Sequence, residues 1–121
     1  WLPRRPVGAA HVQRWMSIAA GALRYGPALA RAIKLLDLPL DPEPPQALAK
    51  KLFGVMDAHL ADHSFLAADR ATLADIALYS YTAHAPEGDV SLDSYPAIRA
   101  WLARVEALPG FVPMSRIGKA D

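Results

Sequence analysis

The chain has 121 residues, of which 53% are hydrophobic and 21% charged, and its formal net charge is +1. These values are typical of one soluble globular domain that is long enough to bury a hydrophobic core. They exclude the strongly basic surface that nucleic acid or an anionic membrane requires, and the absence of cysteine excludes disulfides, thiolate metal ligands and a thiol nucleophile. The balanced charge disfavours nucleic acid as a partner, and the absence of cysteine fits an intracellular compartment, so we expect a cytoplasmic protein. The apolar stretches are too short to span a membrane, so we expect no membrane as a partner.

The first predicted element is a long amphipathic helix. Apolar residues recur at helical spacing between residues 7 and 23, with polar residues between them. Gly26 and Pro27 then weaken the helical ladder, because proline has no backbone N–H and its ring clashes with the preceding turn. We therefore expect a kink or a short break there, followed by a second helical half that ends before Pro39.

The middle of the chain predicts a second helix after a proline-rich connection. Residues 36–46 contain four prolines, which indicates a surface loop. The next helix is expected to begin around Pro45 and to continue through residues 47–63 for about four turns. His59 and His63 are four residues apart on it, but no third ligand is spaced beside them, so we expect two solvent-exposed histidines and no metal site.

Residues 69–88, DRATLADIALYSYTAHAPEG, predict a buried helix with a charged residue one turn from its start. Thr72 and Asp75 have the spacing of a capping box, in which the two side chains accept hydrogen bonds from each other's backbone amides. We interpret Asp75 as structural rather than catalytic, because no second acid or nucleophile is spaced to cooperate with it. The segment from His84 to Gly88 is expected to end the helix.

The last predicted helix has the clearest apolar stripe in the chain. It is expected to start at Ser94 and Pro96 and to end before Pro109. No window alternates apolar and polar residues as a strand does, so the predicted fold class is all-α, an orthogonal bundle of about five or six helices. Residues 1–121 are expected to form this single helical domain, with residues 112–121 as a loosely ordered tail.

Several of these segments resemble a known family. The capping-box helix TLADIALYSY, the segment YPAIRAWLARVEALPGF and the long first helix with its Gly-Pro interruption are similar to the C-terminal helical domain of cytosolic glutathione S-transferases. The stretch QRWMSIAAGALRYGPALAR resembles the bacterial transferases in particular. The resemblance covers nearly the whole chain and implies the helical bundle of that domain.

The resemblance also implies a second domain with a different task. In this family a thioredoxin-like domain precedes the helical one, binds glutathione and supplies the tyrosine, serine or cysteine that activates its thiol. The present chain lacks that domain and begins with tryptophan, so we expect a fragment that has no catalytic residue and no cofactor and is inactive alone. Glutathione would be the co-substrate of the longer protein, which would conjugate it to small hydrophobic electrophiles or use it to reduce peroxides.

In the family, the helical domain provides the wall of the hydrophobic-substrate pocket and part of the dimer interface. Aromatic and aliphatic residues at helical spacing more often pack in a hydrophobic core than line a pocket. We expect the face that would pack on the absent domain to be apolar and exposed, and we expect a homo-oligomer that covers the helix around Trp15 to Leu23. For this chain the resemblance assigns the pocket wall to side chains with apolar bodies, two of them with hydroxyl tips: Trp15, Ala19, Leu23, Tyr25 and Tyr81.

A function of a different class is also open. Helical domains of this type occur in translation factors and tRNA-synthetase assemblies, so the chain could be a non-catalytic module that binds other proteins. The two hypotheses differ in what lies upstream of Trp1. A thioredoxin-like βαβ pattern with a serine, tyrosine or cysteine near its start would favour the enzyme.

Overall fold

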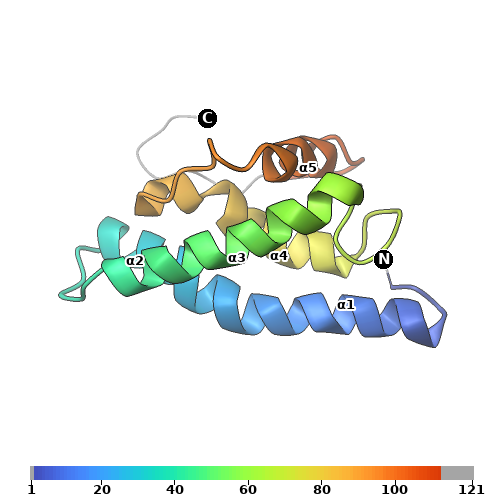
Figure 1. The fold of residues 1–121 in the computed structure, drawn as a ribbon, viewed down its shortest axis with the longest axis horizontal. Helices are drawn as coiled ribbons and strands as arrows, with labels where there is room; N and C mark the ends of the chain where they lie inside the picture. The colour runs from blue at the N-terminus through green and yellow to red at the C-terminus, as the bar shows by residue number, and fades with distance from the viewer. Residues whose placement is uncertain (1, 113–121) are drawn as a thin grey trace.

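The computed structural model describes residues 2–112, which form helices and loops (Figure 1) and contain no strand. Three helical pieces at the N-terminal side join end to end into one long rod (Figure 1). Three further helices and a short 3₁₀ turn follow this rod. In chain order the elements are α1 (Pro6–Ile18), the π-helical η1 (Ala19–Ala28), α2 (Leu29–Leu35), α3 (Glu43–Asp62), α4 (Leu73–Ala83), the 3₁₀ turn η2 (Ala85–Gly88) and α5 (Pro96–Glu106).

The helix does not break at Gly26 and Pro27. The α-helical ladder gives way there to the wider π-helical form, and the rod bends along this stretch, in keeping with the kink that was the other expectation (Figure 1). Hydrogen bonds in a π-helix join residues five apart, so Pro27 does not meet the carbonyl four residues before it that an α-helix would place against its ring. The rod therefore continues into α2. The predicted all-α class is confirmed. Counting the rod as one helix, residues 2–112 contain four long helices, the rod with α3, α4 and α5, rather than five or six, because the two helices expected first form this single rod.

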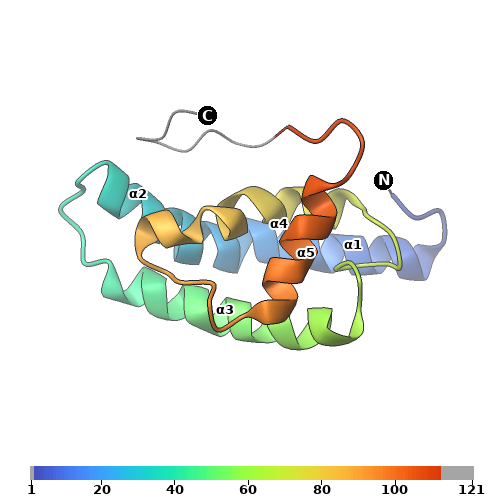
Figure 2. The ribbon, with the colours of Figure 1, turned by 90° about the horizontal axis from the view of Figure 1, so that it is seen from above.

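The helices enclose one hydrophobic core. Helices α3 and α4 both pack against the rod, and α5 crosses over α3 and α4 (Figure 2). The turn η2 packs against α2 near the other end of the rod. Large side chains with no more than 1% of their surface exposed fill the space between these elements: Trp15, Phe53, Met56, Leu78 and Trp101.

Helix α5 is capped by a residue from another helix. The Ncap residue is Tyr95, which makes no side-chain cap, so Ser94 does not start the helix as predicted. Asp57 of α3 takes this place: its Oδ1 accepts a hydrogen bond from the backbone N–H of Ile98 at 3.0 Å. This bond satisfies one of the four N–H groups that a helix start leaves without an intrahelical acceptor.

The predicted tail, residues 112–121, lies outside the described residues except for Val112. Within residues 2–112, none of the helices combines the length and the apolar character needed to cross a membrane.

Candidate functional site

Asp75 is fully buried at the start of α4, and its carboxylate joins three segments of the chain. Oδ2 accepts from the Thr72 N–H at 2.8 Å, while Oδ1 accepts from the Leu66 N–H at 3.0 Å and from Trp101 Nε1 at 2.8 Å. Thr72 Oγ1 accepts from the Ala74 N–H at 3.2 Å, and both bonds of a capping box are present. These partners account for a charge at this buried position without any ligand.

Two of the five predicted pocket residues meet at a surface hollow between the rod and α4. Tyr25 from η1 and Tyr81 from α4 line this hollow, which has a volume of about 410 Å³, and their exposed fractions are 54% and 40%. They are far apart in sequence and come together because α4 packs against η1. We call this the tyrosine hollow, and its other lining residues are Arg24, Ala28, Leu29, Arg31 and Ala32.

The other three predicted pocket residues do not line the tyrosine hollow. Trp15 and Leu23 are buried in the hydrophobic core, with 1% and 2% of their surface exposed. Ala19 is partly buried and packs against the same core. Within this domain, Trp15 and Leu23 therefore have no surface to offer a ligand, because α3 and α4 already cover the side of the rod that carries them.

A chain of hydrogen bonds behind the tyrosine hollow holds Arg31 in place. Arg31 Nε donates to Glu87 Oε2 at 2.6 Å, and the other Glu87 oxygen lies 3.0 Å from Nδ1 of His84, whose side chain is only 3% exposed. Burial alone raises the pKa of Glu87, but the hydrogen bonds from His84 and Arg31 outweigh it and lower this pKa below its ordinary value. Glu87 is thus held as a carboxylate that orients the guanidinium.

Sequence reasoning missed this arrangement because it preferred the end of a helix over the lip of a pocket for the segment from His84 to Gly88. The spacing of His84 and Glu87, three residues apart in a helical turn, is the one local signal that could have indicated a contact. Nothing in the sequence indicates that Arg31, on a different helix, would join them.

His59 near the end of α3 and His63, which caps this helix, each form a hydrogen bond with a backbone carbonyl. His59 Nε2 donates to the Leu66 carbonyl oxygen at 2.7 Å, His63 Nδ1 donates to the His59 carbonyl oxygen at 2.8 Å, and their rings stack 4.1 Å apart. His59 is half-buried against Trp15 rather than solvent-exposed as predicted, and this burial lowers its pKa. Residues 2–112 contain no group of three metal-ligating side chains.

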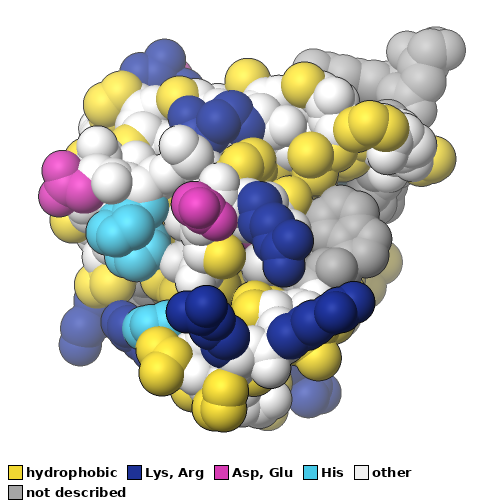
Figure 3. Space-filling view, turned by 90° about the vertical axis from the view of Figure 1, so that its right-hand side faces the viewer, with side chains coloured by type: hydrophobic (Ala, Val, Ile, Leu, Met, Phe, Trp, Pro, Cys, Tyr) yellow, Lys and Arg dark blue, Asp and Glu magenta, His cyan; other side chains and the backbone are white. Residues whose placement is uncertain are grey.

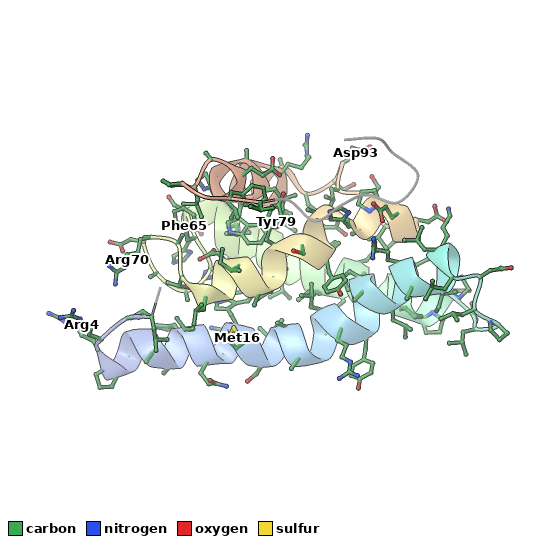
Figure 4. The ribbon with its side chains drawn as sticks, turned by 180° about the vertical axis from the view of Figure 1, so that it is seen from behind. Arg4, Met16, Phe65, Arg70, Tyr79 and Asp93 are labelled. Carbon is green, nitrogen blue, oxygen red and sulfur yellow. The ribbon has the colours of Figure 1, made fainter. Side chains whose placement is uncertain are left out.

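A second, larger hollow of about 940 Å³ lies at the N-terminal end of the rod. Arg4, two residues before the rod begins, and Arg70, on the loop before α4, both lie at this end (Figure 4). Basic side chains gather on this face (Figure 3). We call it the arginine hollow. None of the predicted pocket residues lines it, so the tyrosine hollow is the candidate site.

Comparison with known proteins identifies the family of this chain. Residues 43–109, more than half of the chain, match the family model described as glutathione S-transferase, C-terminal domain. The chain belongs to this family. No curated protein matches the chain.

Solved glutathione S-transferases share the fold of this domain. A glutathione S-transferase from Xanthobacter autotrophicus Py2 is 31% identical over 93% of the chain, with a TM-score of 0.88, and one from Pseudomonas fluorescens Pf-5 is 33% identical over 93% with a TM-score of 0.86. A possible glutathione S-transferase from Rhodopseudomonas palustris is 32% identical over 99%, with a TM-score of 0.84. The chain spans 57–58% of the length of these three proteins.

Proposed function

We propose that this glutathione S-transferase C-terminal domain forms the hydrophobic-substrate wall of an enzyme that conjugates glutathione to small electrophiles. The observation that carries the proposal is the tyrosine hollow, which brings Tyr25 and Tyr81 to one surface from two helices. Its volume of about 410 Å³ lies within the range of small-ligand pockets. The reaction needs a glutathione thiolate beside an apolar electrophile, and this domain supplies the apolar side of that arrangement.

The wall proposed here consists of two kinds of residue. Tyr25 and Tyr81 face the electrophile with their rings and hydroxyls. Trp15 and Leu23, buried in the core, support the rod from behind, and Ala19 packs beside them. Glutathione and the residue that activates its thiol belong, in this proposal, to a thioredoxin-like domain of the longer protein.

The experiment uses the longer protein encoded with this domain. We expect it to be retained on immobilised glutathione and to turn over 1-chloro-2,4-dinitrobenzene, while the 121-residue chain alone does neither. Replacing Tyr25 or Tyr81 with alanine should raise KM by about tenfold, because each substitution removes a contact with the bound electrophile. If the longer protein neither binds glutathione nor turns over the electrophile, the proposal is contradicted. That result would favour the alternative hypothesis of a non-catalytic module that binds other proteins.

We also propose that the chain self-associates in solution. In the stretch from Trp15 to Leu23, expected to be the contact face, Trp15 and Leu23 themselves are buried in the core, and the residues between them are half-buried or exposed. Large exposed apolar side chains lie farther along and outside the tyrosine hollow, at Leu36 and Leu40, with exposed fractions of 66% and 56%. Apolar surface of this kind favours contact with a second copy of the chain, because its burial removes apolar area from water.

A further inference from the structure

We infer that the electrophile bound in the tyrosine hollow carries an anionic group, such as an aromatic carboxylate. The inference rests on the proposed function, since it names the substrate class of the same site. It starts from the chemistry of the lining side chains. Four of them end in hydrogen-bond donors: the guanidinium groups of Arg24 and Arg31 and the phenols of Tyr25 and Tyr81. Among the described residues, no carboxylate lines the hollow.

Arg31 is the fixed cation of the tyrosine hollow. Its side chain is 15% exposed, and Glu87 holds its Nε from behind at 2.6 Å. A guanidinium has five N–H donors, and the carboxylate engages only the Nε edge. The Nη atoms of Arg31 have no acceptor within residues 2–112, so they are available to a ligand in the hollow it lines.

Arg24 is the second cation, and no acidic side chain of the described residues pairs with it. Its guanidinium lies over the ring of Tyr25, with Cζ 5.4 Å from the ring centroid. Counting Arg24, Arg31 and the partner Glu87, the groups around the hollow carry a net charge of +1. An anion entering the hollow therefore meets an uncompensated positive charge.

The tyrosine hydroxyls complete the donor set. The hydroxyls of Tyr25 and Tyr81 form no hydrogen bond with the described residues, and both line the hollow. Ala28, Leu29 and Ala32 supply the apolar surface between the polar groups. Donors surrounding an apolar patch suit an aromatic ring with a carboxylate, since hydrogen bonds to an ionised acceptor are stronger than those to a neutral one.

The test compares two probes of nearly the same shape, the anionic 3-nitrobenzoate and the neutral 3-nitrobenzamide. Their dissociation constants for the 121-residue chain are measured by calorimetry, and the bound site is located by amide chemical shifts. We expect the benzoate to bind about tenfold more tightly than the benzamide, as one charge-assisted hydrogen bond predicts. The largest shifts should fall at residues 24–32 and at Tyr81.

Two variants separate the tyrosine hollow from general attraction to a basic protein. Arg24→Met removes one positive charge from the tyrosine hollow and should abolish most of the preference for the benzoate. Arg4→Met removes one charge from the arginine hollow, so it matches the change in net charge and should leave the preference intact. The preference should also weaken as salt concentration rises.

Several outcomes would overturn the inference: equal affinity for both probes, no binding of either, or benzoate shifts that cluster around Arg4 and Arg70. These outcomes are independent of glutathione. A longer protein that conjugates 1-chloro-2,4-dinitrobenzene but shows no preference for the benzoate contradicts this inference alone. A chain that prefers the benzoate, within a longer protein that lacks conjugating activity, contradicts the proposed function alone.

Discussion

At the scale of single residues, the buried carboxylate of Asp75 joins three segments of the described chain. Its carboxylate accepts from the backbone of Thr72 and Leu66 and from the indole of Trp101. The bond to Thr72 spans three residues and was predictable from the capping-box spacing. The bond to Trp101 spans 26 residues and was not, because a sequence pattern does not show which distant donor will be packed against a carboxylate.

We predict that Asp75→Asn lowers the free energy of unfolding by about 3 kcal/mol. The asparagine amide places N–H donors where a carboxylate oxygen now accepts from protein N–H groups, so buried donors lose their acceptor. Urea unfolding followed by tryptophan fluorescence measures the change. Asp62→Asn, at an exposed position on α3, is the control and should change stability by less than about 0.5 kcal/mol. Equal effects of the two substitutions would contradict the role given to Asp75.

A second prediction concerns His59 and the dependence of the chain's stability on pH. Its pKa in the folded chain lies below the ordinary value of 6.5, chiefly because it is partly buried, although the bond to the Leu66 carbonyl acts in the opposite direction. Electrostatic repulsion from the side chains of His63, Arg14 and His11 lowers the pKa of His59 further. As the pH falls below about 6.5, the unfolded chain therefore takes up a proton at this position more readily than the folded chain does.

The chain should accordingly be less stable at pH 5.5 than at pH 7.5. His59→Gln keeps a side-chain N–H that can donate to Leu66 but removes the titrating ring, so its stability should fall less between these pH values. Urea midpoints at the two pH values measure this, with His11→Gln, an exposed histidine, as the reference. If His59→Gln and His11→Gln lose the same stability on acidification, burial of His59 is not the cause.

At the scale of elements, the contact between η2 and α2 depends on a glycine. A Cβ added at Gly88 would lie 2.6 Å from the backbone nitrogen of Arg31 and 2.8 Å from the carbonyl carbon of Ala30. Backbone atoms cannot move aside as a side chain can, so the turn would have to separate from the rod. The same close approach brings Glu87 next to Arg31, which links this packing to the geometry of the tyrosine hollow.

We predict that Gly88→Ala lowers the free energy of unfolding by about 2 kcal/mol, as overpacking of a core position does. Gly54→Ala is the matched control: it lies inside α3, and a Cβ there meets nothing within 4 Å. Because alanine favours a helix over glycine, the control should be stabilised by about 0.5 to 1 kcal/mol. Thermal unfolding of both variants measures the contrast, and two changes of the same sign would contradict the close approach at Gly88.

The helices themselves were largely predictable from sequence, while the connection within the rod and the contacts between helices were not. Apolar spacing indicated α3, α4 and α5, because one side of each helix faces the core. The π-helix at Pro27 was missed, since the local rule that proline breaks a helix does not include a change of hydrogen-bond register. The cap of α5 by Asp57 was missed because its donor and acceptor belong to different helices.

At the scale of the whole molecule, the candidate site depends on how the helices assemble. Tyr25 and Tyr81 were expected on the pocket wall through the family resemblance rather than through their spacing, and the packing of α4 on the rod brings both to one hollow. The same resemblance also named Trp15 and Leu23, which the assembly buries. Residue type alone cannot separate these cases, because an aromatic side chain on a helix suits a core and a pocket equally well.

The exposed apolar residues predict self-association of the chain through the region of Leu40. Leu40 is 56% exposed beside a hollow of about 320 Å³ between the rod and the start of α3, lined mainly by apolar side chains that include Ile33 and Leu48. Leu40→Lys would place a charge in a buried contact between two copies, so it should raise the dimer dissociation constant by at least about tenfold. Val55→Lys, at a position 53% exposed on α3 and outside this hollow, is the matched control and should not. Sedimentation equilibrium measures both, and an unmodified chain that stays monomeric at high concentration would contradict the prediction.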